Sequence, residues 1–351
     1  MHVTPEHREE PVMSPDRATR RPRVRRSRVC RAVIAVLAAV LLLPAGIAGA
    51  DGQLEEFVAL DPAAGEFPEG IAIGKTGIVY LSLLPRDQIL EIDRDGTRSV
   101  LAQLPVGSRP AGMALDAAGT LYVAGSGILL EEPPPFKTNR EVRGVYRIAR
   151  DGSFEHIAGS DAIVFPNDVT LDKRGNLYVT DSSDGAVWRI PRRGAPELWL
   201  QDELLEGLDL FGFGPIGANG IAFHHDRIIV ANTEAGRLVE IPVRPDGTAG
   251  VPTTLVEDAA LEGTDGIALD VHGTIYAATG LFNTVVRVEG DGSVTTLATV
   301  ADGLSQPSTM AFGTVRGEQP TLFVANFSIF ETDPKPGVVK LPVDAPGRPM
   351  P

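Results

Sequence analysis

The stretch FPNDVTLDKRGNLYVTDS, residues 165–182, contains the pattern that decides the fold of this chain. An apolar phrase that opens a strand is followed by a polar turn and by a second strand of alternating apolar residues. Similar phrases open five further segments. They are FPEGIAI (67–73), RPAGMALD (109–116), GANGIAF (217–223), GTDGIALD (263–270) and QPSTMAF (306–312). A phrase that returns with this regularity indicates a repeat architecture.

Two further strand patterns follow in each repeat. The third strand alternates with period two and in most repeats ends in an Asp-Gly turn, as in GVYRIARDG (144–152), which is a hairpin signal. A looser fourth strand leads to the next phrase. Six such repeats predict an all-β, six-bladed β-propeller with four-stranded antiparallel blades, in a single domain over residues 51–351. We expect LEEFVAL (54–60) to supply the outer strand of the last blade.

The first fifty residues differ from the rest of the chain. An Arg-rich stretch precedes an apolar run, residues 32–45, and Ala48-Gly49-Ala50 follows as a small-residue cleavage site. We predict that residues 1–50 are a signal peptide cleaved near Ala50, so that the mature domain is secreted or periplasmic. A membrane-spanning helix is the weaker alternative, because it needs about 20 apolar residues and this run contains Pro44.

The mature domain is strongly acidic and has no cysteine. The formal charge of the whole chain is −14, and removal of residues 1–50, with nine Lys and Arg against four Asp and Glu, makes it −19. Such a surface should repel nucleic acid and anionic membranes, although the acidity also serves solubility. The single cysteine, Cys30, lies in the leader, so the exported domain has no disulfide and depends on packing.

Polar side chains recur at one equivalent position of the six phrases, which we call the ring position. In chain order the ring positions are Glu69, Ala111, Asn167, Asn219, Asp265 and Ser308. Because the blades of a propeller surround one axis, equivalent positions form a ring. We predict that four of them bind a metal: Glu69, Asn167, Asn219 and Asp265. Two carboxylates and two amides give oxygen ligands with a net charge of −2, which suits Ca²⁺.

Other interpretations of the ring stay open or are disfavoured. Zinc is disfavoured because no His or Cys stands at a ring position. Magnesium or another divalent cation remains an alternative, although Mg²⁺ prefers a more strictly octahedral, water-rich site. Asn and Asp beside Gly are also ordinary turn formers, which explains any one of these residues but not four in one register. No organic cofactor is expected.

Two insertions lengthen the repeats. One is residues 125–144, between the second and third strands of blade two, and the other is residues 202–217, which lead into the Asn219 phrase. Long loops in a compact domain are usually functional or disordered. We expect residues 202–217 to cover the end of the propeller that holds the ring, with an inconsequential surface loop as the alternative. Candidate pocket walls are Phe165, Phe211, Phe213, Phe282 and Phe327, with a packing role as the alternative for each.

The phrases FPNDVTLDKRGNLYVTDS and TDGIALDVHGTIYAA, together with the ring, resemble the senescence marker protein/gluconolactonase family of regucalcin-like proteins. The resemblance covers residues 60–343 and implies a six-bladed propeller hydrolase. It implies that a calcium-type ion in the central tunnel is bound by the four residues at the corresponding positions. These are Glu69, Asn167, Asn219 and Asp265. Sugar lactonases of this family hold hydroxyls with an Arg and an Asn near blade two, where the insertion obscures a match to Asn139, Arg140 or Arg143.

The resemblance implies a Ca²⁺-dependent hydrolase of a lactone or related ester that acts on a small molecule, and the leader predicts that this hydrolase is secreted. The metal would polarise the carbonyl group, and Asp265 would act as general base or, on phosphotriesters, as nucleophile. The alternative is a non-catalytic propeller that binds partners and uses the central metal structurally, because fold alone does not decide function.

Overall fold

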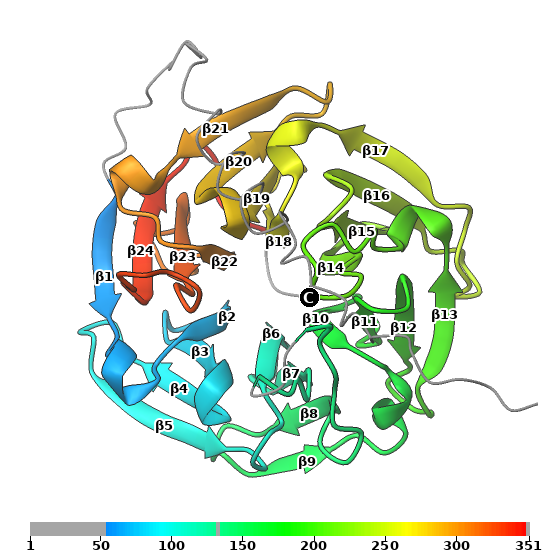
Figure 1. Cartoon of the computed structure of the whole chain (residues 1–351), viewed down its shortest axis with the longest axis horizontal. Helices are drawn as coiled ribbons and strands as arrows, with labels where there is room; N and C mark the ends of the chain where they lie inside the picture. The colour runs from blue at the N-terminus through cyan, green and yellow to red at the C-terminus, as the bar shows by residue number, and fades with distance from the viewer. Residues whose placement is uncertain (1–53, 131–133, 349–351) are drawn as a thin grey trace, which may run out of the picture. The chain divides into compact units, whose positions relative to one another are not determined.

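The computed structural model describes residues 54–130 and 134–348, and Figure 1 shows that their strands form a closed ring of blades. These residues form six sheets, each with four antiparallel strands. The predicted all-β, six-bladed propeller with four-stranded blades is therefore confirmed. The predicted signal peptide, residues 1–50, lies outside the described residues.

In the first three blades the strands follow the chain from the axis outward. Blade one has β2 (Pro68–Ile73), β3 (Val79–Leu83), β4 (Gln88–Ile92) and β5 (Arg98–Gln103). Blade two has β6 (Pro110–Leu115), β7 (Leu121–Gly125), β8 (Gly144–Ile148) and β9 (Phe154–His156). Blade three has β10 (Pro166–Leu171), β11 (Leu177–Asp181), β12 (Ala186–Ile190) and β13 (Glu197–Gln201).

The other three blades are arranged in the same way, except that β1 completes the last of them. Blade four has β14 (Ala218–His224), β15 (Arg227–Asn232), β16 (Arg237–Pro242) and β17 (Thr253–Glu257). Blade five has β18 (Thr264–Leu269), β19 (Ile275–Thr279), β20 (Thr284–Val288) and β21 (Val294–Ala298). Blade six has β22 (Pro307–Phe312), β23 (Thr321–Asn326), β24 (Gly337–Pro342) and β1 (Glu55–Ala59).

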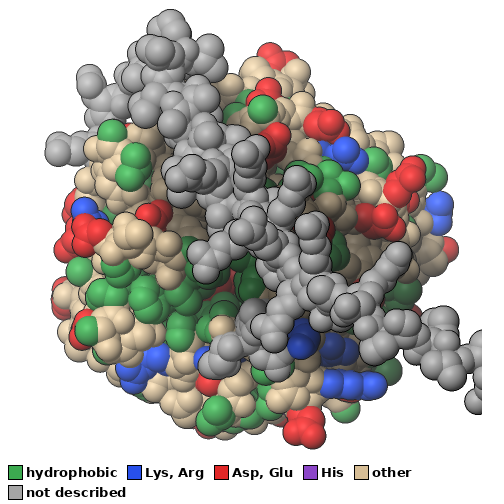
Figure 2. All heavy atoms as spheres, in the orientation of Figure 1, with side chains coloured by type: hydrophobic (Ala, Val, Ile, Leu, Met, Phe, Trp, Pro, Cys, Tyr) green, Lys and Arg blue, Asp and Glu red, His purple; other side chains and the backbone are tan. Residues whose placement is uncertain are grey.

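Helical structure in the described residues consists of single 3₁₀ turns between strands. These are η2 (Pro62–Ala64), η3 (Leu84–Arg86), η4 (Ser160–Ala162), η5 (Glu203–Leu205), η6 (Ala259–Leu261), η7 (Gly280–Phe282) and η8 (Val300–Asp302). None of the helices in residues 54–130 and 134–348 is long and apolar enough to cross a membrane. On the face shown in Figure 2, acidic side chains lie at several separate places around the rim.

The ring is closed by the strand nearest the N-terminus of the domain. β1 pairs with β24, with Glu55 opposite Lys340 and Ala59 opposite Gly337. The prediction that residues 54–60 supply the outer strand of the last blade is thereby confirmed. Blade six takes strands from both ends of the domain, so blades one and six cannot separate without breaking hydrogen bonds of that sheet.

The hydrophobic core lies between neighbouring blades. Leu81 of blade one and Phe323 of blade six belong to one buried cluster, while Ile89 of blade one and Val123 of blade two belong to the next. Each blade is therefore covered on both faces, and all six residues of β2 are buried. Burial of apolar surface on both faces is what allows a domain without disulfides to be stable.

A β-bulge marks every ring position. In β2, Pro68 pairs with Leu83 and Ile71 pairs with Leu81, so Glu69 and Gly70 together oppose a single residue of β3. The inner strands of all six blades shift register at the equivalent place. Because a bulge re-aims the side chains beside it, the sequence repeat becomes a ring of side chains at the axis.

The inner strands approach one another so closely that glycine is required after most ring residues. A Cβ added at Gly70 would overlap the carbonyl oxygen of Ala111 in blade two. We expect Gly70→Ala to lower the free energy of unfolding by about 1–3 kcal/mol, because the backbone of a packed core must shift. Chemical denaturation in the presence of EDTA measures this effect.

Gly290→Ala is the matched control, since an added Cβ there has no neighbour within 4 Å. Its free energy of unfolding should change by no more than about 0.5 kcal/mol. Equal losses in the two variants would show that the approach of blades one and two does not restrict residue 70.

Candidate metal centre

The four side chains predicted to bind a metal lie together at one end of the axis. Each is the second residue of an inner strand: Glu69 in β2, Asn167 in β10, Asn219 in β14 and Asp265 in β18. All four line one cavity of about 150 Å³. The exposed fractions of Glu69, Asn167 and Asn219 are 8%, 8% and 5%. Residues up to 196 positions apart in sequence are thus brought to one buried site.

Hydroxyl groups orient the two amides of the ring. Nδ2 of Asn167 donates a hydrogen bond to Oγ of Ser182 at 3.1 Å, and Nδ2 of Asn219 donates to Oγ1 of Thr233 at 3.0 Å. These bonds fix which end of each amide is nitrogen, so the amide oxygens remain for a cation. Oxygen ligands of this kind are what Ca²⁺ prefers.

The same hydroxyls connect each blade to the next. Oγ of Ser182 donates to the carbonyl oxygen of Ala218 at 2.6 Å, and Oγ1 of Thr233 donates to that of Thr264 at 2.7 Å. Ala218 and Thr264 immediately precede the ring residues Asn219 and Asp265. The position of each ring residue is therefore coupled to the orientation of the preceding one.

Burial and repulsion between like charges raise the pKa values of the ring carboxyl groups. Burial raises the pKa of Asp265 to about 7, with the charge of Asp168 adding to the shift and a hydrogen bond from Asn219 opposing it. The pKa of Glu69 lies well above its usual range, because the group is buried and faces the charges of Asp265 and Asp168. Among the described residues, the charges that act on these two groups are carboxylates alone.

The residues at the axis fit a hard divalent cation. Oε2 of Glu69 and Oδ1 of Asn219 are buried and have no hydrogen-bond donor among the described residues. Buried oxygens without a partner are costly, and a bound cation would supply the partner that they lack. In the same part of the chain, no cluster of three or more His, Cys, Asp or Glu side chains is placed to hold a metal.

Asp168 is an axial acid that comparison of the repeats did not single out. It follows a ring residue where four other blades have Gly70, Gly112, Gly220 and Gly266. Its Oδ1 accepts the N–H of Val169 at 2.8 Å, and its Oδ2 accepts the N–H of Ile221 in the next blade at 3.1 Å. Burial raises the pKa of Asp168 to about 7. The sequence already shows this difference: Asp168 is the one acidic residue at a position where four of the six phrases have glycine.

The two remaining ring positions carry no charged or amide side chain. Ala111 presents only a methyl group to the cavity. Oγ of Ser308 donates to the carbonyl oxygen of Glu69 at 2.6 Å and thereby joins blade six to blade one. Ser308 therefore takes part in closing the circle, whereas Ala111 offers no ligand atom.

The insertion at residues 202–217 contributes to the cavity, as predicted. Its residues Phe211, Phe213 and Ile216 line the same space as the ring. Phe136 and Leu130 of the blade-two insertion do so as well. Two loops that lengthen the repeats therefore meet at the end of the propeller that holds the ring.

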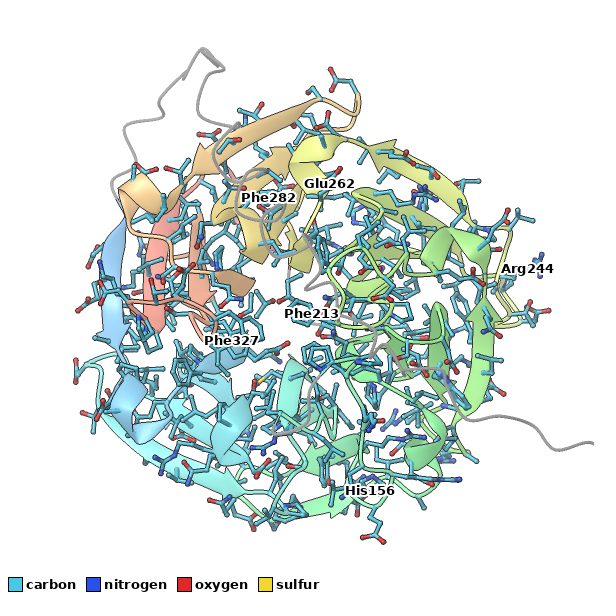
Figure 3. The ribbon with its side chains drawn as sticks, in the orientation of Figure 1. His156, Phe213, Arg244, Glu262, Phe282 and Phe327 are labelled. Carbon is cyan, nitrogen blue, oxygen red and sulfur yellow. The ribbon has the colours of Figure 1, made fainter. Side chains whose placement is uncertain are left out.

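The predicted aromatic walls are correct in four cases of five. Phe165, Phe211, Phe213 and Phe327 line the cavity, whereas Phe282 does not and is 53% exposed. Phe282 lies at the end of the 3₁₀ turn η7, where its neighbour Leu281 reaches the cavity instead. In Figure 3, Phe213 and Phe327 lie near the axis, while His156 and Arg244 lie at the periphery.

The residues Asn139, Arg140 and Arg143 of the blade-two insertion do not line the cavity. Arg140 pairs with the carboxylate of Asp161 at 2.9 Å. The guanidinium of Arg143 donates to the main chain of Asp161 at 3.0 Å and to Oγ1 of Thr138 at 2.8 Å. Oδ1 of Asn139 accepts a main-chain N–H within its own turn. These residues hold the loop in place.

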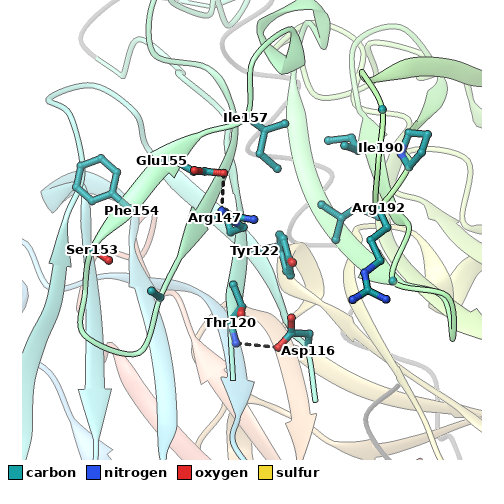
Figure 4. Close-up of a pocket in the computed structure, with 15 residues that line it drawn as sticks. Asp116, Thr120, Tyr122, Arg147, Ser153, Phe154, Glu155, Ile157, Ile190 and Arg192 are labelled. Atoms are coloured by element: carbon teal, nitrogen blue, oxygen red, sulfur yellow. Dashed lines mark hydrogen bonds and ion pairs between the residues drawn. The ribbon is translucent and has the colours of Figure 1, made fainter. Parts of the chain in front are cut away.

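A larger depression, of about 600 Å³, lies between blades two and three (Figure 4). Arg147 in this groove is paired with Glu155 at 3.0 Å, and Asp116 accepts the N–H of Thr120 at 2.9 Å within a turn. None of the ring residues lines it. The groove is a polar seam between blades two and three.

Solved structures of other propellers are similar to this chain. A gluconolactonase from Xanthomonas campestris is 19% identical, with a TM-score of 0.62 over 84% of this chain and 91% of that one. The calcium-binding protein regucalcin from Agrobacterium tumefaciens is 17% identical, with a TM-score of 0.61 over 82% and 93%. Virginiamycin B lyase from Staphylococcus aureus is 15% identical, with a TM-score of 0.55 over 84% and 89%. At these identities the likeness establishes the fold alone.

Sequence comparison identifies the family. No curated protein matches the chain. The family model of the SMP-30/gluconolactonase/LRE-like region matches residues 138–327, which is more than half of the chain and includes Asn167, Asn219 and Asp265. The chain therefore belongs to the SMP-30/gluconolactonase/LRE-like family.

Proposed function

We propose that this protein is an exported, Ca²⁺-dependent hydrolase of a lactone or related ester, with Asp265 as general base. The observation that carries the proposal is that the carboxyl groups of Glu69 and Asp265 and two oriented amides line one cavity, with no Lys, Arg or His among its described lining residues. Family membership supports lactone hydrolysis, and the Arg-rich leader supports export. A cavity of this kind suits a small molecule, and the acidic surface disfavours nucleic acid.

The chemistry follows from the position of Asp265 in the cavity wall. A Ca²⁺-type cation held by Glu69, Asn167, Asn219 and Asp265 would polarise the carbonyl group of the substrate. Asp265 would take a proton from water as the water oxygen forms a bond to the carbonyl carbon. The C–O bond of the lactone ring then breaks, and the proton passes from Asp265 to the leaving oxygen. Apolar walls exclude other water and strengthen these electrostatic interactions.

Of the three predictions that follow from this proposal, the first concerns the pH dependence of metal binding. The pKa of Asp265 is raised to about 7, so the group holds a proton below pH 7 that a cation must displace. Calcium affinity should therefore rise with pH and be about tenfold weaker at pH 6 than at pH 8, from this group alone. Titration calorimetry at both pH values measures the affinity, and repetition in buffers of different ionisation enthalpy measures the protons released. Equal affinities without proton release would contradict the proposed ligand set.

The second prediction concerns the hydroxyl that positions a ligand. Thr233→Val keeps the shape of the side chain but removes the acceptor for Nδ2 of Asn219, so the amide loses its fixed orientation. We expect calcium affinity to fall about tenfold, as is typical when the partner of a metal ligand is removed. Thr248→Val, in an exposed turn, is the control and should bind calcium as the wild type does. An unchanged affinity in Thr233→Val would show that the hydroxyl does not orient the amide.

The third prediction concerns catalysis. Hydrolysis of a broad panel of lactones and aryl esters should require calcium, stop with EDTA, and fall at least 100-fold in kcat in Asp265→Asn. Asp291→Asn, in a surface turn, is the matched control and should retain full activity. If calcium binds tightly but no member of the panel is hydrolysed, the non-catalytic propeller with a structural metal becomes the better interpretation.

A further inference from the structure

The space above the ring is bounded by phenylalanine side chains that we call the aromatic wall. They come from three separate loops and from the residue before the inner strand β10: Phe136, Phe165, Phe211, Phe213, Phe327 and Phe330. A substrate carbonyl at the ring would have the rest of its molecule against this wall. The wall therefore selects the part of the substrate that does not react.

Four rings of the aromatic wall, those of Phe136, Phe213, Phe327 and Phe330, form a continuous band. Phe136 and Phe213 are stacked, with centroids 5.0 Å apart and planes inclined by 4°. Phe213 and Phe330 are also nearly parallel, at 6.1 Å and 14°. Phe327 meets Phe330 edge to face at 6.4 Å. The band thus links the blade-two insertion, the loop before blade four and the loop after β23.

Buried polar contacts hold the band in place. Glu234, which is 2% exposed, accepts the N–H groups of Asp209 at 2.8 Å and Leu210 at 3.0 Å and so anchors the loop that carries Phe213. The N–H of Phe136 donates to the carbonyl oxygen of Phe213 at 2.7 Å. An apolar surface that is already ordered loses little entropy when it binds a ligand.

The polar side chains of the cavity outside the ring are largely engaged by the protein. Oγ of Ser126 and Oγ1 of Thr233 donate to main-chain carbonyl oxygens at 3.0 and 2.7 Å. Oε1 of Gln306 accepts the N–H of Phe330 at 3.0 Å. Among the described residues that line the cavity there is no Lys, Arg or His. The walls therefore offer few partners for a substrate with several hydroxyl groups.

The ratio of apolar to hydrogen-bonding side chains in the cavity favours one of two substrate classes, sugar lactones or hydrophobic lactones. Away from the ring, each hydroxyl that enters such a cavity loses water and finds few partners, which weakens binding several-fold per group. Each methylene buried against the aromatic wall strengthens binding by up to about fourfold. A polyhydroxylated sugar lactone is thus disfavoured, and a lactone with an alkyl or aryl substituent is favoured.

We propose that this site takes hydrophobic lactones or esters, with an alkyl or aryl substituent packed against the aromatic wall, rather than sugar lactones. This inference rests on the proposed hydrolase function for its catalytic readout, but the preference of the cavity can also be measured by binding alone.

The catalytic test compares γ-lactones with substituents from methyl to heptyl, and glucono-δ-lactone, in the presence of calcium. The value of kcat/KM should rise about two- to fourfold per methylene until the cavity is filled, and should be at least 100-fold lower for glucono-δ-lactone than for the best alkyl lactone. A flat series, or a preference for glucono-δ-lactone, would overturn the inference while leaving a calcium-dependent hydrolase in place.

Phenylalanine variants inside and outside the cavity test whether the aromatic wall causes the preference for longer substituents. Phe330 is 60% exposed and lines the cavity, whereas Phe282 is 53% exposed and does not. Phe330→Ala and Phe213→Ala should flatten the rise of kcat/KM with chain length, while Phe282→Ala should retain it. Thermal unfolding of each variant establishes that it is folded. If all three variants keep the wild-type slope, the aromatic wall does not select the substrate.

A binding test separates the two proposals. Calorimetry with calcium and the non-hydrolysable lactams that correspond to γ-undecalactone and glucono-δ-lactone should show at least tenfold tighter binding of the alkyl lactam. That result without any turnover would support the hydrophobic site and overturn the hydrolase. Equal binding, tighter binding of the sugar lactam, or no binding of either lactam would overturn the hydrophobic site.

Discussion

Six inner strands converge on one axis, and the crowding there controls the local sequence of every blade. A Cβ after the ring residue would strike the backbone of the next blade at Gly70 or Gly220. Where blade three has Asp168 at this position, its carboxylate packs on Gly112 of blade two and accepts an N–H of blade four. Glycine and the accompanying β-bulge are therefore the steric condition under which six strands can meet and still direct side chains to the centre.

The same crowding places carboxyl groups close together at the centre. Among the described residues, no basic side chain acts on the pKa values of Glu69, Asp168 and Asp265. A purely structural core would gain stability from apolar residues at such positions, because buried charge without a partner is costly. Retention of these carboxylates, with amides oriented beside them by Ser182 and Thr233, is the arrangement expected of a cation site.

Repeat and insertion divide the roles within the cavity. The repeat supplies the floor, because equivalent positions of several blades face the same axis. The insertions supply part of the walls, because residues 202–217 and the blade-two loop are absent from the other blades and carry Phe136 and Phe213 into the cavity. The preference for hydrophobic substrates proposed above depends on these loops and not on the repeat.

The sequence by itself determined the number of blades, the closing strand at residues 54–60 and the four equivalent polar residues, because a repeat converts spacing along the chain into symmetry around an axis. It also indicated that residues 202–217 cover the ring. Only the tertiary structure decided that Asp168 joins the axial acids, that Phe282 points elsewhere, and that Arg140 and Arg143 bind Asp161 and its neighbours rather than a ligand. These outcomes depend on side-chain direction in irregular loops and on contacts between distant blades. The repeat pattern of the sequence predicts neither of them.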